Sequence, residues 1–285
     1  MLTLGDEATG QGADLETYSY MQLGLEATPN IKAVIVLADG TTSSYVAVKY
    51  GLLVYGDAEI TSGELGTGAL DLQSLNTDVW GICTLFVSGD LTVSGGSLNV
   101  KSGEPAEGTG SVAIGAGGNV NLYGGTIDIT VASEDTTCTN TIGIMSGYAG
   151  SGDINFGLSG KGKDSLKVTV RVYCPQNFTT ASGMQAGIST STKGSVNFNA
   201  GDYVAYVGNS DDTTTWVGSA VAAKTKINLD TESFSVTNAL AGDKTYTQAT
   251  KDQDLEIASR SKLVLLNTMP DGSTEETDRE QIGEN

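Results

Sequence analysis

The sequence contains no histidine, 3 cysteines and only 4 prolines among its 285 residues. Without histidine there is no imidazole base or metal ligand, which excludes Ser-His-Asp and Cys-His catalysis. The cysteines, Cys83, Cys138 and Cys174, lack the close spacing of a zinc site. We expect buried free thiols, because an unpaired cysteine behaves as a small apolar residue. A bridge between Cys138 and Cys174 stays open as an alternative.

Positive charge is also scarce, with 15 basic residues against 34 acidic ones and a net charge of −19. Proteins bind nucleic acids by neutralising phosphates with lysine and arginine, and anionic membranes attract basic segments. The charge therefore predicts neither nucleic acid nor an anionic membrane surface as a partner. It favours solubility and is compatible with cation binding.

Long apolar stretches are missing as well. No run of 18 apolar residues occurs, so the sequence predicts no membrane span. The first 22 residues are polar and do not read as a signal peptide. Export of this chain would require a leader outside the sequence.

What the sequence does contain is a repeated apolar pattern at offsets 0, 2, 7 and 9. The offset of 2 is the period of a β-strand, whereas a helix would show offsets of 3 and 4. One copy is weak, and one is interrupted by five extra residues, 161–165. In chain order the copies are Ala58-Ile60-Leu65-Thr67, Leu91-Val93-Leu98-Val100, Val120-Leu122-Ile127-Ile129, Ile154-Phe156-Leu166-Val168, Val196-Phe198-Tyr203-Ala205 and Ile227-Leu229-Phe234-Val236.

Each copy has the elements of one solenoid coil. A glycine-containing corner such as Ser94-Gly95-Gly96 separates the two strand pairs, and a third apolar segment such as Gly143-Ile144 precedes the copy. Three strands and three corners in about 30 residues make one coil, which must stack on its neighbours to bury its apolar side. A sandwich or barrel would instead need hairpin turns, and Asp-Gly pairs occur only outside the repeats.

The pattern therefore predicts an all-β chain, a single-stranded right-handed parallel β-helix of about seven coils over residues 30–270, with terminal caps. Residues 1–29 are expected to form an N-terminal segment or cap, with a short helix around 14–23. Residues 271–285 are acidic and poor in apolar side chains, which predicts a tail or linker.

The phrase GDLTVSGGSLNV (89–100), with Gly81-Ile82 before it, resembles repeats of bacterial cell-surface proteins with the pectate-lyase-like β-helix fold. It is most similar to their carbohydrate-binding-domain group, over roughly residues 31–240. The resemblance implies a secreted or cell-surface location. It also implies a polysaccharide ligand, bound with calcium in some members, or a place within a large adhesin. This chain departs from the group because its coils lack a regular Asp-rich motif, and a shared fold does not fix function.

Polar side chains recur at offset 1, between the first two inward residues, where strand alternation points them outward. Stacked amides can hydrogen-bond into a structural ladder, or the column can form a polar track for sugar hydroxyls. This column is Glu59, Thr92, Asn121, Asn155, Asn197 and Asn228. The neighbouring column at offset 8, Gly66, Asn99, Asp128, Val204 and Ser235, is polar only in its middle.

Aromatic side chains that could stack on a sugar ring are Tyr123, Tyr148, Tyr173, Trp80 and Trp216. We expect Tyr123 to be exposed at a corner and Trp80 to be part of the core. Trp216 follows an acidic loop in a long insertion, where function is often found.

Calcium prefers several oxygen ligands, and the candidate carboxylates are Asp211 and Asp212, with Glu134 and Asp135 as a second pair. The alternative for both pairs is simple solvation. The predicted ligand-binding residues are Thr92, Asn121, Asn155, Asn197, Asn228, Tyr123 and Trp216, with calcium at Asp211 and Asp212.

The sequence predicts no catalytic residues. Only Arg171 with Asp128 and Asp153 suggests a lyase or glycosidase constellation, and any acidic solenoid offers such pairs. The expected function is therefore a non-catalytic module that binds a polysaccharide, such as a host or cell-wall glycan. The alternatives are a structural stalk or adhesin segment without a small ligand, and a polysaccharide lyase or glycoside hydrolase.

Overall fold

The structure of the chain is a computed structural model. It describes residues 1–17, 20–27, 31–48, 50–75, 82–103, 110–132, 140–148, 150–173, 184–190, 193–208, 219–222, 226–229, 233–239, 254–257, 263–268 and 274–277. Apart from the 3-10 turn η1 (Lys163–Ser165), the regular structure in these ranges is β.

The helix expected around 14–23 is wrong, because β2 (Asp14–Thr17) and β3 (Met21–Leu23) lie there. The apolar residues of this segment follow the period of a strand, and both strands pair with the next coil.

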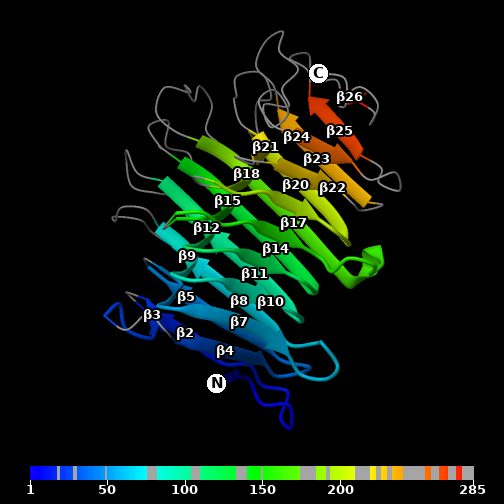
Figure 1. The fold of residues 1–285 in the computed structure, drawn as a ribbon. Coiled ribbons are helices and arrows are strands. Elements are labelled where there is room, and N and C mark those ends of the chain that lie inside the picture. Colours follow the sequence, from blue (N-terminus) through cyan, green and yellow to red (C-terminus); the bar gives the residue numbers. More distant parts are fainter. Residues whose placement is uncertain are drawn as a thin grey trace.

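The strands form three sheets, and from β1 to β21 the chain visits the sheets in rotation (Figure 1). Sheet 1 contains β1 (Leu2–Leu4), β4 (Lys32–Leu37), β7 (Asp57–Ser62), β10 (Leu91–Val93), β13 (Val120–Leu122), β16 (Ile154–Phe156), β19 (Val196–Phe198), β22 (Lys226–Leu229) and β24 (Asp254–Ile257). Sheet 2 contains β2, β5 (Thr42–Ala47), β8 (Ala69–Ser74), β11 (Ser97–Ser102), β14 (Gly125–Ala132), β17 (Leu166–Tyr173), β20 (Asp202–Gly208), β23 (Ser233–Ala239), β25 (Leu263–Thr268) and β26 (Thr274–Thr277). Sheet 3 contains β3, β6 (Leu52–Val54), β9 (Ile82–Val87), β12 (Gly110–Ala116), β15 (Asn140–Ser146), β18 (Met184–Thr190) and β21 (Ser219–Ala222).

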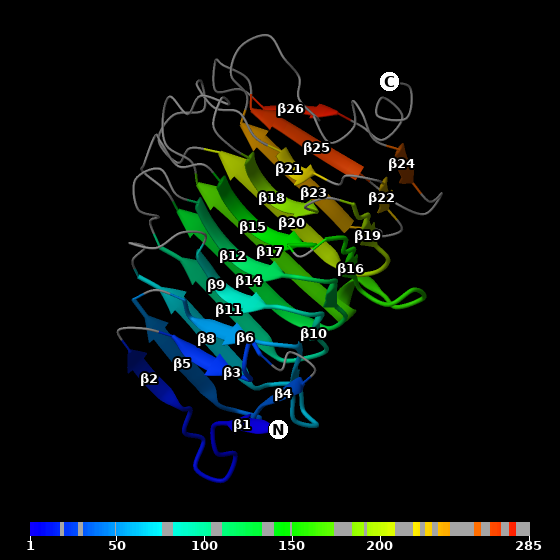
Figure 2. The ribbon, with the colours of Figure 1, turned by 60° about the vertical axis from the view of Figure 1, so that its left-hand side comes forward.

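Strand neighbours within each sheet are parallel, which makes the chain a parallel β-solenoid. The exception is β26, which runs antiparallel to β25 and falls within the segment predicted as an acidic tail. Figure 2 shows the strands as successive rungs from β1 and β2 at one end to β25 and β26 at the other.

The predicted alignment of the first inward residue of each copy is confirmed. Leu91 pairs with Val120, and the register continues through Ile154 and Val196 to Ile227. All eight residues that the sequence places inside the two clearest copies are buried: Leu91, Val93, Leu98, Val100, Val120, Leu122, Ile127 and Ile129.

Two copies depart from the fixed offsets. Leu98 pairs with Leu70 rather than with Leu65, which is 79% exposed. Ile127 pairs with Val168, so the interrupted copy resumes two residues later than the sequence suggested. Both errors arise because the corner between sheets 1 and 2 is longer there, so the second strand cannot be found by counting a constant number of residues.

Aromatic side chains also stack in register inside the solenoid. Phe156 and Phe198 pair across β16 and β19, with ring centroids 4.8 Å apart and nearly parallel planes. Tyr203 meets both rings edge-on, at 5.4 and 5.0 Å. The edge contacts of Tyr203 suit the charge distribution of aromatic rings.

The corner between sheets 1 and 2 depends on glycine where coils approach closely. Gly96 and Gly125 both have positive φ angles, 81° and 92°. A Cβ on Gly125 would lie 2.2 Å from the carbonyl oxygen of Gly96. Backbone therefore stacks directly on backbone at this corner, which agrees with the glycine corner predicted from the sequence.

A second corner, before the strands of sheet 1, is held by a ladder from side chain to backbone. Asp57 Oδ1 accepts from the N–H of Asp90 (2.9 Å), and Asp90 Oδ1 accepts from the N–H of Asn119 (2.7 Å). Asn119 Oδ1 accepts from Asp153 N–H (2.8 Å), and Asp153 Oδ1 accepts from Ser195 N–H (2.7 Å). We call these five residues the corner ladder. It joins each coil to the next just before the strands of sheet 1, where these backbone N–H groups bond to a side-chain oxygen instead of a backbone carbonyl.

The long corner at 63–68 is fastened by the buried carboxylate of Asp39. It accepts hydrogen bonds from the backbone N–H groups of Leu65 (2.7 Å) and Thr67 (2.8 Å) and from the hydroxyl of Ser62 (3.0 Å). Desolvation raises the pKa of Asp39, but these hydrogen bonds together outweigh it and hold the pKa below its ordinary value.

We expect Asp39→Asn to lower the thermal unfolding midpoint near neutral pH. The NH₂ group of the asparagine would face the N–H and O–H donors that bond to the carboxylate of Asp39. The lowered folded-state pKa means that the carboxylate stabilises the fold above the ordinary value of about 3.9. This contribution is lost as the pH falls through the folded-state pKa. Thermal scans across the acidic range should therefore show the two proteins converging. Asp164→Asn, at an exposed position of η1, is the matched control, and an equal loss in both variants would contradict the role of Asp39.

Candidate functional site

The predicted asparagine column exists on the outer side of sheet 1. In-register pairing places Glu59, Thr92, Asn121, Asn155, Asn197 and Asn228 in one line across β7, β10, β13, β16, β19 and β22. Asn155 Nδ2 donates to Asn121 Oδ1 at 2.9 Å, and Asn197 Nδ2 donates to Asn155 Oδ1 at 2.8 Å. The three side chains are half-buried. The structural alternative, an amide ladder, is therefore present.

The bonds of the amide ladder use half of the hydrogen-bonding capacity of Asn155. An asparagine amide has two N–H donors and two acceptor positions, and Asn155 uses one of each within the ladder. The ladder alone therefore neither requires nor excludes a ligand along sheet 1.

Of the other predicted ligand and metal residues, only Tyr123 lies among the described residues. Tyr123 is half-buried rather than exposed, because its hydroxyl donates to Asn121 Oδ1 at 3.2 Å beside the ladder. Trp216, Asp211 and Asp212 lie outside the described residues, as do Trp80, Glu134 and Asp135. Asn228 keeps its register with Asn197, and its side chain lies outside the description.

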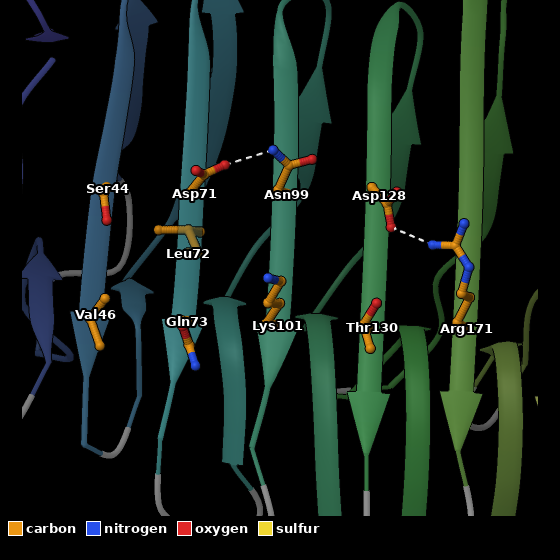
Figure 3. A pocket seen from close by; sticks show the side chains of 10 residues that line it. All are labelled: Ser44, Val46, Asp71, Leu72, Gln73, Asn99, Lys101, Asp128, Thr130 and Arg171. Carbon is orange, nitrogen blue, oxygen red and sulfur yellow. Dashed lines mark hydrogen bonds and ion pairs between the residues drawn. The ribbon is translucent and has the colours of Figure 1, made fainter. Parts of the chain in front are cut away.

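An open groove of about 420 Å³ lies instead on the outer face of sheet 2. Five successive strands, β5, β8, β11, β14 and β17, supply its lining (Figure 3). The lining residues are Ser44, Val46, Asp71, Leu72, Gln73, Asn99, Lys101, Asp128, Thr130 and Arg171. Its volume falls in the range of ligand sites, about 300–1,000 Å³.

Two outward columns, two residues apart along each strand, form the groove. The first places Ser44, Asp71, Asn99 and Asp128 in register. The second is Val46, Gln73, Lys101, Thr130 and Arg171. Successive members of a column are about 4.8 Å apart, the spacing of hydrogen-bonded strands.

Two contacts join neighbouring strands within the groove. Asn99 Nδ2 donates to Asp71 Oδ1 at 2.6 Å, and Arg171 Nη1 donates to Asp128 Oδ1 at 2.9 Å (Figure 3). The ion pair is diagonal, since Arg171 stands opposite Thr130 in the register, and long side chains reach such neighbours. Both charged groups are about two-fifths exposed. They therefore contribute little to stability and remain accessible to a ligand.

Charge in the groove is balanced, unlike that of the whole chain. Asp71 and Asp128 supply two carboxylates, and Lys101 and Arg171 supply two cations. Among the described residues the ion pairs within 4 Å are Arg171–Asp128 and Lys32–Glu59. Lys101 is exposed and belongs to neither pair. The groove can therefore donate and accept hydrogen bonds without a net local charge.

Two of the three residues considered for catalysis meet in the structure. Arg171 and Asp128 meet on sheet 2, but Asp153 belongs to the corner ladder before sheet 1, where its carboxylate accepts from Ser195. The sequence therefore identified the ion pair and misplaced the third member.

The remaining aromatic candidates lie on different faces. Tyr173 is half-buried in sheet 2, two residues beyond Arg171 on the same outward side, so it adjoins the groove. Tyr148 lies outside sheet 3 and meets Phe86 edge-on at 5.7 Å. No aromatic side chain is among the described residues that line the groove.

Cys83 is a buried free thiol, as predicted. Burial raises its pKa to about 12, with a hydrogen bond from Tyr148 acting in the opposite direction. The thiolate is therefore scarce at neutral pH, and Cys83 serves as packing. Cys138 and Cys174 lie outside the described residues.

Two further findings concern only the described part of the chain. No three of its acidic or thiol side chains are grouped in a way that could hold a metal ion. No helix there is long and apolar enough to cross a membrane.

Sequence reasoning missed half of the groove. The offset-8 column included Asn99 and Asp128 but assigned Gly66 to the place that Asp71 occupies. The second column was missed because the repeat template ended at the inward residue before it. Continuing the strand alternation by two positions would have found Lys101 and Thr130, but not Gln73, because the copy that starts at Ala58 was out of register.

Comparisons with protein-family models, with curated proteins and with solved structures find no match for this chain. The parallel β-solenoid fits the fold that the resemblance implied. Membership of the carbohydrate-binding-domain group stays a prediction.

Asn155→Ala should lower the free energy of unfolding by about 1–2 kcal/mol, because it removes two hydrogen bonds and leaves their partners half-buried. Urea denaturation monitored by circular dichroism measures the change. Thr92→Ala is the matched control, since Thr92 occupies the same column and no side-chain hydrogen bond is found for it in the described structure. Equal stability losses in the two variants would show that the amide ladder is not stabilising.

Proposed function

We propose that this chain is a non-catalytic module, secreted or on the cell surface, that binds a neutral polysaccharide along the outer face of sheet 2. The observation that carries the proposal is the open groove lined by polar side chains of five successive strands. The architecture is taken as a right-handed β-helix of about seven coils, because parallel crossovers are right-handed in about 98% of cases.

The regular spacing of the groove suits a polymer. An extended chain that crosses the strands meets one polar group of each column every 4.8 Å or so. A small compact ligand would use only part of such an array. The groove therefore favours a repeating ligand over a single metabolite.

The chemistry of the lining suits hydroxyl groups. A sugar hydroxyl both donates and accepts, and the groove offers carboxylates at Asp71 and Asp128, amides at Gln73 and Asn99 and a guanidinium at Arg171. With no aromatic platform in the described lining, recognition relies on direct and water-mediated hydrogen bonds. Tyr173 adds a ring at the margin.

The local charge balance favours a neutral glycan. Such a ligand needs no cation to overcome the overall charge of −19. Calcium would be needed only for an anionic ligand. Bound at Asp211 and Asp212, it would bridge that ligand to the chain.

A structural stalk is the second candidate function. The observation that favours it is that the amide ladder and the corner ladder join successive coils by hydrogen bonds. Catalysis is not proposed, because Asp153, the third member of the constellation, lies in the corner ladder before sheet 1, while Arg171 and Asp128 meet on the outer face of sheet 2.

The test compares two asparagines on different sheets. Calorimetric titration with cellohexaose, xylohexaose and mannohexaose, guided by a glycan array, should detect binding of at least one. Asn99→Ala should then weaken that binding about tenfold, the effect of losing one or two hydrogen bonds to a ligand.

Asn121→Ala, which alters a hydrogen-bonded asparagine of sheet 1, is the matched control and should leave the affinity unchanged. If Asn121→Ala weakens binding and Asn99→Ala does not, the ligand lies along sheet 1 and the groove is not the site. If no glycan binds in the presence or absence of calcium, the stalk is the better description.

A further inference from the structure

The groove on sheet 2 contains two acid–base pairs that are placed in the same way. Arg171 on β17 is the diagonal neighbour of Asp128 on β14. Lys101 on β11 is likewise the diagonal neighbour of Asp71 on β8. In each pair the cation lies on the strand after the acid and two residues further along. We call Asp128 with Arg171 the closed pair and Asp71 with Lys101 the open pair.

The two pairs differ in their contacts. In the closed pair, Arg171 Nη1 donates to Asp128 Oδ1 at 2.9 Å (Figure 3). In the open pair, Lys101 is exposed and makes no ion pair with any described residue. Asp71 Oδ1 accepts from Asn99 Nδ2 at 2.6 Å, and its Oδ2 has no hydrogen-bond partner in the described part of the chain. The open pair therefore offers an ammonium group and a carboxylate oxygen to a ligand.

The chemistry of the open pair selects a neutral group with a donor on one side and an acceptor on the other. An ammonium group only donates hydrogen bonds, and an ionised carboxylate only accepts them. A carboxylate on the ligand would be attracted by Lys101 and repelled by Asp71, and an ammonium group would experience the reverse. An amide is neutral, and its N–H and C=O point in opposite directions. It can therefore accept from Lys101 and donate to Asp71 at the same time.

A hydroxyl group suits the open pair less well than an amide. It must make both bonds through one oxygen, so it bridges only groups that nearly touch. Diagonal neighbours on adjacent strands are about 7–8 Å apart at the backbone, and the charged ends of Lys101 and Asp71 are farther apart than an ion pair. An amide spans such a gap because its donor and acceptor are separate atoms.

The spacing of the pairs suits a polymer that carries such amides. The arrangement repeats after two strands, from β8 and β11 to β14 and β17, which is about 9.6 Å at the usual strand spacing. Successive sugars of an extended β-1,4-linked glycan face in opposite directions, so a substituent returns to the same edge at every second sugar. Each sugar advances such a chain by roughly one strand spacing. A glycan lying across the strands therefore presents like substituents to the open and closed pairs.

We propose that the open pair is the specificity-determining subsite of the groove and binds the acetamido group of an N-acetylated glycan. Lys101 Nζ donates to the acetyl carbonyl, and Asp71 Oδ2 accepts from the amide N–H. The inference rests on the proposed function, because it requires a neutral glycan on the outer face of sheet 2. It names the substituent by which the groove distinguishes one such glycan from another.

The test compares two hexasaccharides with the same β-1,4-linked backbone. Chitohexaose carries an acetamido group on each sugar where cellohexaose carries a hydroxyl. In calorimetric titrations of the full chain, chitohexaose should bind about tenfold more tightly, the effect of one or two additional hydrogen bonds. Lys101→Met should lower the affinity for chitohexaose to that for cellohexaose and leave the latter unchanged.

Lys167→Met is the matched control. It removes the same charge from an exposed lysine on the outer face of sheet 2, outside the lining of the groove, and should preserve the preference for chitohexaose. Asp71→Ala tests the other half of the open pair and should also remove the preference. Hexaglucosamine keeps the nitrogen but lacks the acetyl carbonyl, so its affinity should not fall in Lys101→Met.

The outcomes separate this inference from the proposed function. Equal affinities of the unaltered chain for chitohexaose and cellohexaose would overturn the inference and leave glycan binding in the groove standing. Binding of xylohexaose or mannohexaose without binding of chitohexaose would do the same. A preference for chitohexaose that survives both Lys101→Met and Asp71→Ala would place the acetamido group elsewhere and overturn the inference too. If no glycan binds at all, the proposed function fails along with it.

Discussion

Parallel stacking in register is the constraint on which the rest of this structure depends. Backbone hydrogen bonds between equivalent strands place one residue position of a coil over the same position of the next. The side chains of each column must therefore make compatible contacts with one another along the stack. Asparagine lies over asparagine in sheet 1, Phe198 over Phe156 in the interior, and the side-chain oxygens of the corner ladder receive the N–H of the coil that follows.

The same constraint explains why the groove differs from the rest of the surface. Strands of sheet 1 such as β10, β13 and β16 have three residues and so one outward position, whereas β11, β14 and β17 are longer and present several. Only the longer strands can carry two polar columns side by side. The width of sheet 2 thus creates a surface on which groups from different columns meet, as Arg171 and Asp128 do.

Much of the fold could be predicted because inward positions repeat strictly. The alignment of Leu91 with Val120 could be predicted from the offsets, which are the same in all regular copies of the repeat. The prediction failed where corners change length, since the segment 63–68 held by Asp39 shifts Leu70 into the place expected for Leu65. The bonds from Asp39 to this longer corner occur once and do not repeat along the sequence, so the repeat pattern could not reveal them.

The candidate site was less predictable for a related reason. A column of unlike residues such as Asp71, Asn99 and Asp128 becomes visible only after the register is known. The corner ladder, by contrast, was present in the sequence as an acidic, amide or hydroxyl residue immediately before each first inward residue, from Asp57 to Ser195. A template that began one position earlier would have included it.

The corner ladder has a consequence for how such a chain can change over generations. Because each rung joins only adjacent coils, an in-frame duplication of one coil would insert a rung whose donor and acceptor both find partners. The stack would lengthen by about 4.8 Å and the existing contacts would be preserved on either side. Length is thus a property that recombination can adjust without redesign of the interior. The reach of the molecule can vary among descendants while the cross-section stays the same.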